Sequence, residues 1–320
     1  MPALDMPLEQ LREYRGCNPK PADFDEYWAD ALAEMRGTDP DVSLSASAEF
    51  SARNAECLDM YFTGVGGARV YCKLLRPRGA KNTPVIFMFH GYGGNSCEWC
   101  SKLNYINEGY TVCALDARGQ AGKSDDIYPA HGTTFNGHIV RGLSDPDPKA
   151  LGFRRIFLDT AQMVYITCGL DFVDPSRLAC TGTSQGGALT LACAALVPEI
   201  KRCVPVVPFL CDYKRVWQMD LDKAAYAELR WWFRNYDPFH LREEEVFTKL
   251  GYIDCVHLSQ RIKAKTLMVS ALLDDICPPS TQFAAYNGMT CEKEMLLLPD
   301  FGHEDNPESR DKAFMFLTGV

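Results

Sequence analysis

One stretch decides the fold of this chain: residues 178–189, which read LACTGTSQGGAL. The apolar run Leu178 to Thr181 is typical of a buried strand, and the Ala- and Leu-rich run after Gly186 is typical of a helix. Between them, Gly182-Thr183-Ser184-Gln185-Gly186 fits the G-x-S-x-G pattern, whose small residues permit a sharp strand-to-helix turn. Such a turn exposes the serine at the carboxyl edge of a sheet. The stretch therefore predicts that Ser184 is a nucleophile.

Short apolar runs alternate with helical stretches on both sides of this turn. Strands are predicted at 84–89, 111–115, 178–181, 203–207, 266–270 and 294–298, and helices at about 155–173, 186–197, 279–287 and 307–318. Strands that are apolar throughout favour a parallel sheet buried on both faces. Two earlier runs, 58–62 and 69–75, flank a glycine-rich turn and are typical of an antiparallel hairpin. This order predicts the α/β-hydrolase fold: a mostly parallel central sheet with an antiparallel start and helices on both faces.

The chain reads as one domain over 1–320, with an N-terminal helical extension over about 1–50 and a helical insertion over about 209–261. The extension contains a predicted helix at 23–35. The insertion is crowded with aromatic residues, namely Trp217, Tyr226, Trp231, Trp232, Phe233, Tyr236 and Phe239. It either forms a lid over the mouth of the active site or a helical layer against the body or another subunit.

Charge and hydropathy exclude several classes of partner. The net charge is -9, and the sequence pI is near 5.2, which argues against binding to nucleic acid or to anionic lipid. No apolar run approaches the roughly 20 residues that a membrane-spanning helix needs. The N-terminus has no basic segment followed by an apolar one, so no secretory signal is expected in this sequence. We expect a cytoplasmic protein.

The sequence has fourteen cysteines, and their placement predicts reduced thiols. Several lie inside apolar runs, where a free thiol behaves as a small hydrophobic group: Cys72, Cys113, Cys180, Cys193 and Cys203. Cys97 and Cys100 have C-x-x-C spacing, but the chain has no second such pair to complete a zinc site. We therefore interpret these two residues as ordinary thiols and expect no metal or other cofactor.

A nucleophilic serine needs a histidine base and an acid that orients it, and in this fold they follow in the order Ser, Asp or Glu, His. His303 lies in a loop after the last predicted strand; His90 precedes the serine, and the other histidines do not follow a late strand. Asp274 and Asp275 both follow the strand at 266–270, and spacing alone favours neither. Asp300 is a distant third candidate.

The negative oxygen of an acyl-transfer intermediate needs two preorganised N–H donors. One is expected from the residue after the nucleophile, Gln185. The other is expected from the loop after the early strand, His90-Gly91-Tyr92-Gly93-Gly94, because its glycines allow the backbone to approach the acyl oxygen.

Three motifs narrow this interpretation: Arg118-Gly119-Gln120, the G-x-S-Q-G turn, and His303-Glu304. With other stretches in the same order along the chain, they make it resemble the acetyl xylan esterase / cephalosporin-C deacetylase family of carbohydrate esterases. The resemblance implies a triad of Ser184, Asp274 and His303 and favours Asp274 over Asp275. It also implies oxyanion donors at the backbone N–H groups of Tyr92 and Gln185. Arg118, Gly119, Gln120 and Glu304 would support the site, with Arg118 paired to a carboxylate.

The resemblance also implies a reaction. Such an enzyme would remove acetyl groups from short xylo-oligosaccharides and from cephalosporin C through an acetyl-serine intermediate, as a hexamer that admits small substrates. One departure is that the segment after Gln120, residues 121–126, lacks the tryptophan that lines the pocket in many members. Two alternatives stay open: a hydrolase of another small ester or acyl substrate, and a catalytically inactive binding protein of the same fold. A thiol-redox role of Cys97 and Cys100 is a less favoured third.

Overall fold

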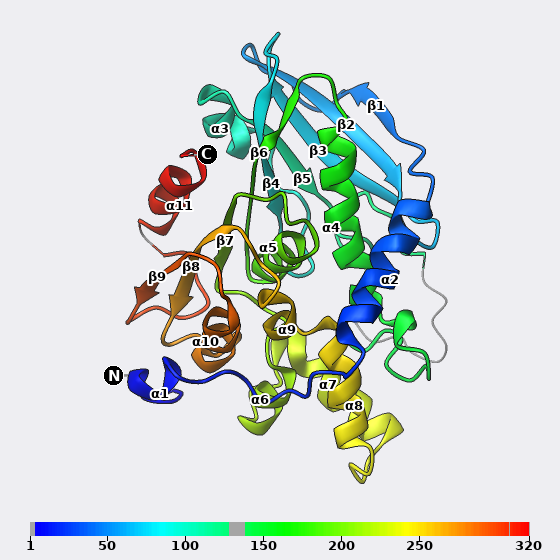
Figure 1. Ribbon diagram of the computed structural model, residues 1–320, viewed down its shortest axis with the longest axis vertical. Helices are drawn as coiled ribbons and strands as arrows, with labels where there is room; N and C mark the ends of the chain where they lie inside the picture. Colours follow the sequence, from blue (N-terminus) through cyan, green and yellow to red (C-terminus); the bar gives the residue numbers. More distant parts are fainter. Residues whose placement is uncertain (1–3, 128–137, 307, 320) are drawn as a thin grey trace.

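The computed structural model describes residues 4–127, 138–306 and 308–319. Within these residues nine strands form one sheet in the order β1-β2-β3-β5-β4-β6-β7-β8-β9 (Figure 1). The strands are β1 Ser43–Ala46, β2 Ala55–Thr63, β3 Arg69–Pro77, β4 Thr83–Phe89, β5 Thr111–Leu115, β6 Val173–Thr183, β7 Arg202–Val206, β8 Lys265–Ala271 and β9 Lys293–Leu298. The pairs from β1 through β3 to β5 are antiparallel, and all the others are parallel. The predicted antiparallel start and parallel continuation are confirmed.

Helices cover both faces of this sheet because its central strands are apolar on both sides. In β4, Val85 and Phe87 belong to one buried cluster and Ile86 to another on the opposite face. The cluster of Ile86 also contains side chains of α3 (Leu103–Asn107) and α11 (Ser309–Leu317). The larger cluster contains side chains of α4 (Gly152–Cys168) and α5 (Gln185–Leu196). Helix α10 (Pro279–Gly288) packs next to β8.

Element boundaries differ from the predicted ones in a few places. The helix predicted at 155–173 ends at Cys168, and β6 already begins at Val173. Strand β1 was not predicted, because all of its residues are exposed and show no apolar pattern. It lies within the N-terminal extension, which is therefore not entirely helical. The helix predicted at 307–318 is α11, and residue 307 lies outside the described residues.

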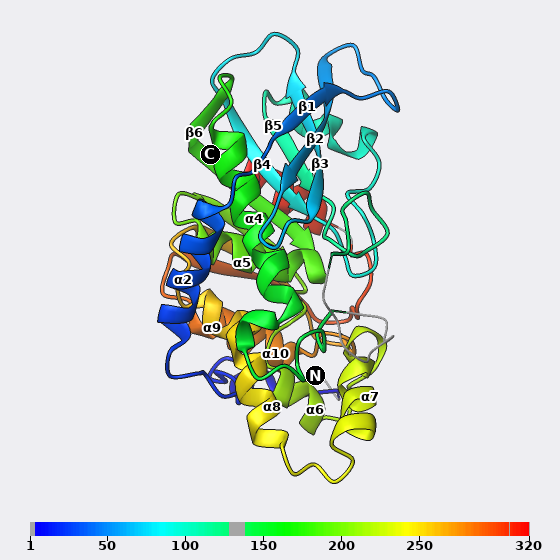
Figure 2. The ribbon, with the colours of Figure 1, turned by 90° about the vertical axis from the view of Figure 1, so that its right-hand side faces the viewer.

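The N-terminal extension joins distant parts of the molecule. It begins with α1 (Leu8–Leu11), followed by α2 (Phe24–Gly37), which lies beside α4 (Figures 1 and 2). Trp28 of α2 is fully buried, and its indole N–H donates to the carbonyl of Tyr252 at 3.0 Å. The backbone N–H of Asn18 donates to the buried carboxylate of Asp212 at 2.9 Å. The extension thus packs against the insertion as well as against the body.

The insertion contains the helices α6 Tyr213–Gln218, α7 Ala227–Tyr236, α8 Glu243–Leu250 and α9 Cys255–Ser259. Helices α6, α7 and α8 lie at the lower end of the molecule in Figure 1, and α9 contacts α5 and α10. Trp232 is buried, and its indole N–H donates to Ser144 Oγ at 2.9 Å, while Lys249 Nζ donates to the Gly142 carbonyl at 2.9 Å. These bonds attach the insertion to the body. Its turn between α7 and α8 exposes Phe239 and Leu241.

All fourteen cysteines lie within the described residues as free thiols, and Cys97 and Cys100 are exposed. No helix within the described ranges combines the length and the apolar character needed to cross a membrane.

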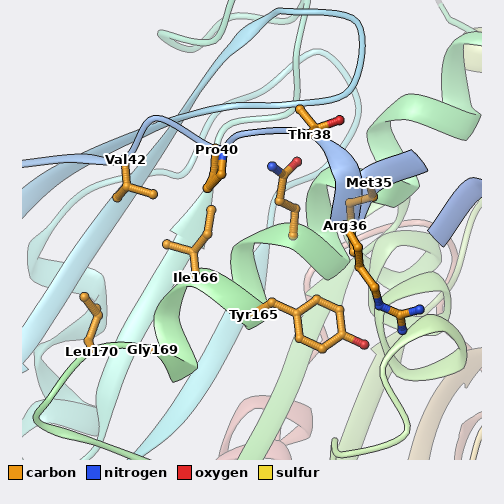
Figure 3. Close-up of a pocket in the computed structure, with 10 residues that line it drawn as sticks. Met35, Arg36, Thr38, Pro40, Val42, Tyr165, Ile166, Gly169 and Leu170 are labelled. Carbon is orange, nitrogen blue, oxygen red and sulfur yellow. The ribbon is translucent and has the colours of Figure 1, made fainter. Parts of the chain in front are cut away.

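A groove of about 560 Å³ lies between the end of α2 and the end of α4. Figure 3 shows Tyr165 and Ile166 of α4 near Arg36 and Pro40 of the N-terminal extension. Ser184 and His303 do not line this groove, so the predicted nucleophile and base lie elsewhere.

Candidate active site

Ser184 occupies a strained turn between β6 and α5. Its φ of +61° is a conformation that non-glycine residues rarely adopt. A Cβ on Gly182 would lie 2.5 Å from the carbonyl oxygen of Gly186, and one on Gly186 would lie 2.2 Å from that of Phe89. Both flanking glycines are therefore required by space.

The structure brings Ser184, His303 and Asp274 together from three strand ends. His303 Nε2 lies 2.9 Å from Ser184 Oγ, and His303 Nδ1 lies 2.8 Å from Asp274 Oδ2. Ser184 follows β6, Asp274 follows β8, and His303 follows β9. Residues far apart in the sequence thus meet because parallel strands end at the same edge of a sheet.

Asp274 and Asp275 have different surroundings. Asp274 is fully buried, and its Oδ1 accepts hydrogen bonds from the N–H groups of Ile276 at 2.9 Å and Cys277 at 2.7 Å. Such donors stabilise a carboxylate away from water. Asp275 lies in an ion pair with Lys223, which lowers the pKa of its carboxyl group. Asp274, not Asp275, is the carboxylate that contacts His303.

The two predicted oxyanion donors lie in separate loops. Gln185 is the first residue of α5, and Tyr92 follows β4 in the glycine-rich loop. Among the described residues, neither backbone N–H donates to a protein acceptor. Unpaired donors at a helix start and in a tight loop are available to a negatively charged oxygen.

Gln120 connects these two loops. Its Nε2 donates to Gln185 Oε1 at 2.7 Å, and its Oε1 accepts from the backbone N–H of Gly93 at 2.8 Å. Gln185 Nε2 donates back to Gln120 Oε1 at 3.1 Å. The two glutamines therefore fix the distance between the segments that carry the Tyr92 and Gln185 amides.

The other residues of the R-G-Q motif hold its loop in place. Arg118 Nε donates to Asp159 Oδ2 at 2.7 Å, and Arg118 Nη1 donates to the Val65 carbonyl at 3.0 Å. The expected pairing of Arg118 with a carboxylate is thus confirmed, and both partners are buried. Gly119 has a φ of +71°, and a Cβ there would lie 2.6 Å from Asp126 Oδ1.

His90 and Glu304 have supporting contacts. His90 Nε2 accepts from the Ala117 N–H at 2.9 Å, which links the end of β4 to the R-G-Q loop, and burial lowers its pKa. Glu304 is exposed, and its Oε1 accepts from the Gly302 N–H at 3.1 Å, next to His303. His131 lies outside the described residues.

Asp274, Cys277 and His303 bring potential metal-ligand atoms within 4.8 Å of one another, among the residues that the structure describes. Asp274 and His303 are already hydrogen bonded to each other through two of these atoms. Burial raises the pKa of Cys277 well above its ordinary value, which disfavours the thiolate that a metal requires. The set fits a hydrogen-bonded relay better than a metal centre.

Sequence analysis missed Gln282 and Glu228. Gln282 Nε2 donates to Asp274 Oδ2 at 3.3 Å, and Glu228 of the insertion accepts from the Tyr92 hydroxyl at 3.2 Å. No local pattern marks either residue, because both lie on helices whose approach to the site depends on tertiary packing.

The fold and this arrangement of side chains define the class of α/β hydrolases. Similar proteins show which family within that class the chain resembles. An acetyl xylan esterase from Thermoanaerobacterium sp. JW/SL YS485 is 51% identical, with a TM-score of 0.96 and coverage of 98% of this chain and 99% of that one. An acetyl xylan esterase from Paenibacillus sp. R4 is 33% identical, with a TM-score of 0.94 and coverage of 98% and 100%. The acetyl esterase Axe7A of Xylanibacter ruminicola is 25% identical over 97% of this chain and 69% of that protein.

The family model for acetyl xylan esterases matches residues 1–320. The chain belongs to the acetyl xylan esterase family and is a carboxylic ester hydrolase.

Proposed function

We propose that this protein removes O-acetyl groups from short acetylated xylo-oligosaccharides through an acetyl-serine intermediate. The observation that carries the proposal is the continuous relay from Ser184 Oγ to His303 at 2.9 Å and from His303 to Asp274 at 2.8 Å. The names of the similar esterases support acetylated xylan as the source of the substrate.

In the first half of the reaction, His303 Nε2 takes the proton of Ser184 as Oγ attacks the acetyl carbonyl carbon. Asp274 accepts a hydrogen bond from Nδ1–H and stabilises the imidazolium that forms. His303 then gives the proton to the departing sugar oxygen, and the ester bond breaks. Acetyl remains bound to Ser184.

In the second half, His303 takes a proton from water, and the resulting hydroxide attacks the acetyl-serine carbonyl. Collapse of the intermediate returns the proton to Ser184 Oγ and releases acetate. The N–H groups of Tyr92 and Gln185 stabilise the negatively charged oxygen in both halves, which contributes about 10²–10³ in rate for each donor.

Three finer features belong to the same proposal. Cephalosporin C is a second substrate, and the enzyme is a cytoplasmic hexamer. Similarity to the family supports the substrate and the hexamer, and the free thiols support the compartment.

The segment after Gln120 lacks a pocket tryptophan, and Lys123 of that segment is ion paired with Glu49. We expect the pocket to be more open on this side. The chain acts as one domain with the extension and the insertion defined above.

Replacement of Ser184 tests the proposal. Ser184→Ala should reduce hydrolysis of p-nitrophenyl acetate by about 10⁵–10⁶. It should also abolish labelling by a fluorophosphonate. The circular dichroism spectrum and the unfolding temperature should remain close to those of the wild-type protein. Unchanged turnover would exclude Ser184 as the nucleophile.

A substrate panel separates the alternatives. Acetate release from acetylated xylo-oligosaccharides and cephalosporin C should exceed release from polymeric acetylated xylan. A preference for p-nitrophenyl butyrate over acetate would indicate a hydrolase of another ester. A wild-type protein that neither turns over esters nor reacts with the fluorophosphonate would be an inactive binding protein.

A further inference from the structure

Glu228 is a buried carboxylate of the insertion that no step of the proposed reaction uses. It lies in the first turn of α7 and is 1% exposed. Its Oε1 accepts from the Tyr92 hydroxyl at 3.2 Å, and its Oε2 accepts from the Val140 N–H at 3.2 Å. The Tyr92 hydroxyl in turn accepts from the His138 N–H at 3.1 Å. A buried carboxylate is costly unless it is paired, so this placement needs an explanation.

The contact matters because Tyr92 carries one of the proposed oxyanion donors. Its ring packs against Phe209 with 5.9 Å between ring centroids and against His138 with 6.2 Å. The N–H of Phe209 donates to the carbonyl of Ser184 at 3.0 Å. The Tyr92 side chain is therefore fixed at its ring and at its hydroxyl. Because the side chain is fixed at both ends, the Cα of Tyr92 cannot shift without breaking these contacts, which restrains the loop backbone that carries the N–H.

We propose that Glu228 is a positioning residue for the hydrolysis: its carboxylate holds Tyr92 in the orientation that directs the Tyr92 N–H at the oxyanion. The inference rests on the function proposed above and extends it to the insertion. Glu228 acts through Tyr92 and does not contact the reacting atoms.

The charge of Glu228 decides how well it performs this role. Burial raises its pKa to about 7, although the hydrogen bonds from Val140 and Tyr92 and the nearby Arg141 oppose the shift. The ionised carboxylate can accept hydrogen bonds at both oxygens, whereas the protonated form must turn one oxygen into a donor. The support for Tyr92 should therefore strengthen as the pH rises through about 7.

Among the residues that the structure describes, the charged and titratable groups that face Glu228 from other elements do not change over the same pH range. Burial raises the pKa of Tyr92 and that of Tyr213 far above neutrality. Burial lowers the pKa of His138 to about 4, so its ring stays neutral. Arg141 is ion paired with Asp126, and a guanidinium remains charged throughout.

The test compares Glu228→Gln with the wild-type protein between about pH 5.5 and pH 8.5, using p-nitrophenyl acetate. Glutamine has the shape of a protonated glutamate but cannot ionise. We expect similar kcat values at the acid end, where Glu228 is protonated in the wild type. At the alkaline end kcat of the variant should be roughly five- to twentyfold lower, since a misdirected donor loses part of the 10²–10³ that one contributes. KM should change less than about twofold.

Two further variants serve as controls. Glu245→Gln removes an exposed carboxylate of α8 in the same insertion, and its pH profile should match that of the wild type. Tyr92→Phe removes the hydroxyl that Glu228 accepts from, so the combined Tyr92→Phe, Glu228→Gln variant should lose little more activity than either single variant.

Parallel pH profiles of Glu228→Gln and the wild type would overturn the inference, as would losses of the two single variants that multiply in the double variant. If Glu228→Gln does not fold, the pH profile of Tyr92→Phe replaces it: a loss of kcat confined to the alkaline end supports the inference, and a profile parallel to that of the wild type overturns it. An error in the proposed function would instead show as a wild-type protein without ester turnover or fluorophosphonate labelling.

Discussion

Tyr92 lies in a loop at the carboxyl edge of the parallel strands and contacts the helical insertion, and these two regions are built in different ways. At the sheet's edge, Ser184 follows β6 directly, and Asp274 and His303 lie in the loops after β8 and β9. The hydrogen-bonded sheet therefore determines where each of these segments leaves its strand. The insertion has no strand to align it. Glu228 reaches Tyr92 from a helix whose position depends on side-chain packing.

The aromatic residues of the insertion provide that packing. Trp217 and Phe233 lie 4.8 Å apart between ring centroids, and Phe233 stacks on His240 at 4.8 Å. Aromatic pairs of this kind add about 0.5–1.5 kcal/mol beyond the burial of their area. The concentration of aromatic residues in this part of the sequence is thus explained mainly by contacts within the insertion. The sheet places Ser184, Asp274 and His303 next to one another, whereas the insertion contacts their surroundings through side chains such as Glu228, which accepts from the Tyr92 hydroxyl.

The largest difference in kcat between two variants is expected at the carboxyl edge of the sheet. Asp274→Asn should lower kcat by about 10³–10⁴, because the amide cannot stabilise the imidazolium as the carboxylate does. Asp275→Asn should change kcat less than about twofold, since it loses only an exposed ion pair. Steady-state kinetics on p-nitrophenyl acetate measures both. Equal losses would mean that the carboxylate in contact with His303 does not orient it.

A smaller loss is expected where the two oxyanion loops are connected. Gln120→Ala should lower kcat by roughly ten- to a hundredfold, because the Gly93 and Gln185 segments lose their shared partner. Asn235→Ala removes an amide from α7 of the insertion, where it donates to the Trp231 carbonyl, and should leave kcat within about twofold. Similar kcat values for the two variants would contradict the connecting role of Gln120.

The smallest effect is expected at the outer turn of the insertion. Phe239 is 81% exposed, and Phe239→Ser should leave kcat and KM within about twofold and change stability by less than about 0.5 kcal/mol. The buried Trp232 provides the contrast, because Trp232→Ala should cost about 3–5 kcal/mol. Urea denaturation followed by circular dichroism measures both. A large rise in KM for Phe239→Ser would indicate that this turn covers the substrate.

The sequence by itself determined the parallel sheet and the order in which the serine, the acidic residue and the histidine of the candidate site follow its strands. Apolar runs long enough for buried strands predicted the parallel sheet, and small residues around Ser184 predicted its turn, because local sterics restrict which residues can occupy such a turn. The positions of an acidic residue and a histidine after late strands followed from the same pattern. The exposed strand β1 could not be predicted, since it has no apolar alternation, and the end of α4 could not be predicted because apolar residues continue past Cys168 into β6.

Only the tertiary structure decided which groups touch. Asp274 and Asp275 are neighbours after the same strand. Asp274 differs because it accepts a hydrogen bond from the Cys277 N–H and contacts His303. The family resemblance favoured Asp274, and in the structure Asp274 is the one of the two that contacts His303. The reach of Gln120 across two loops and the contact of Glu228 with Tyr92 join residues that are 65 and 136 positions apart. Contacts at such separations depend on how whole elements pack, which no local pattern specifies.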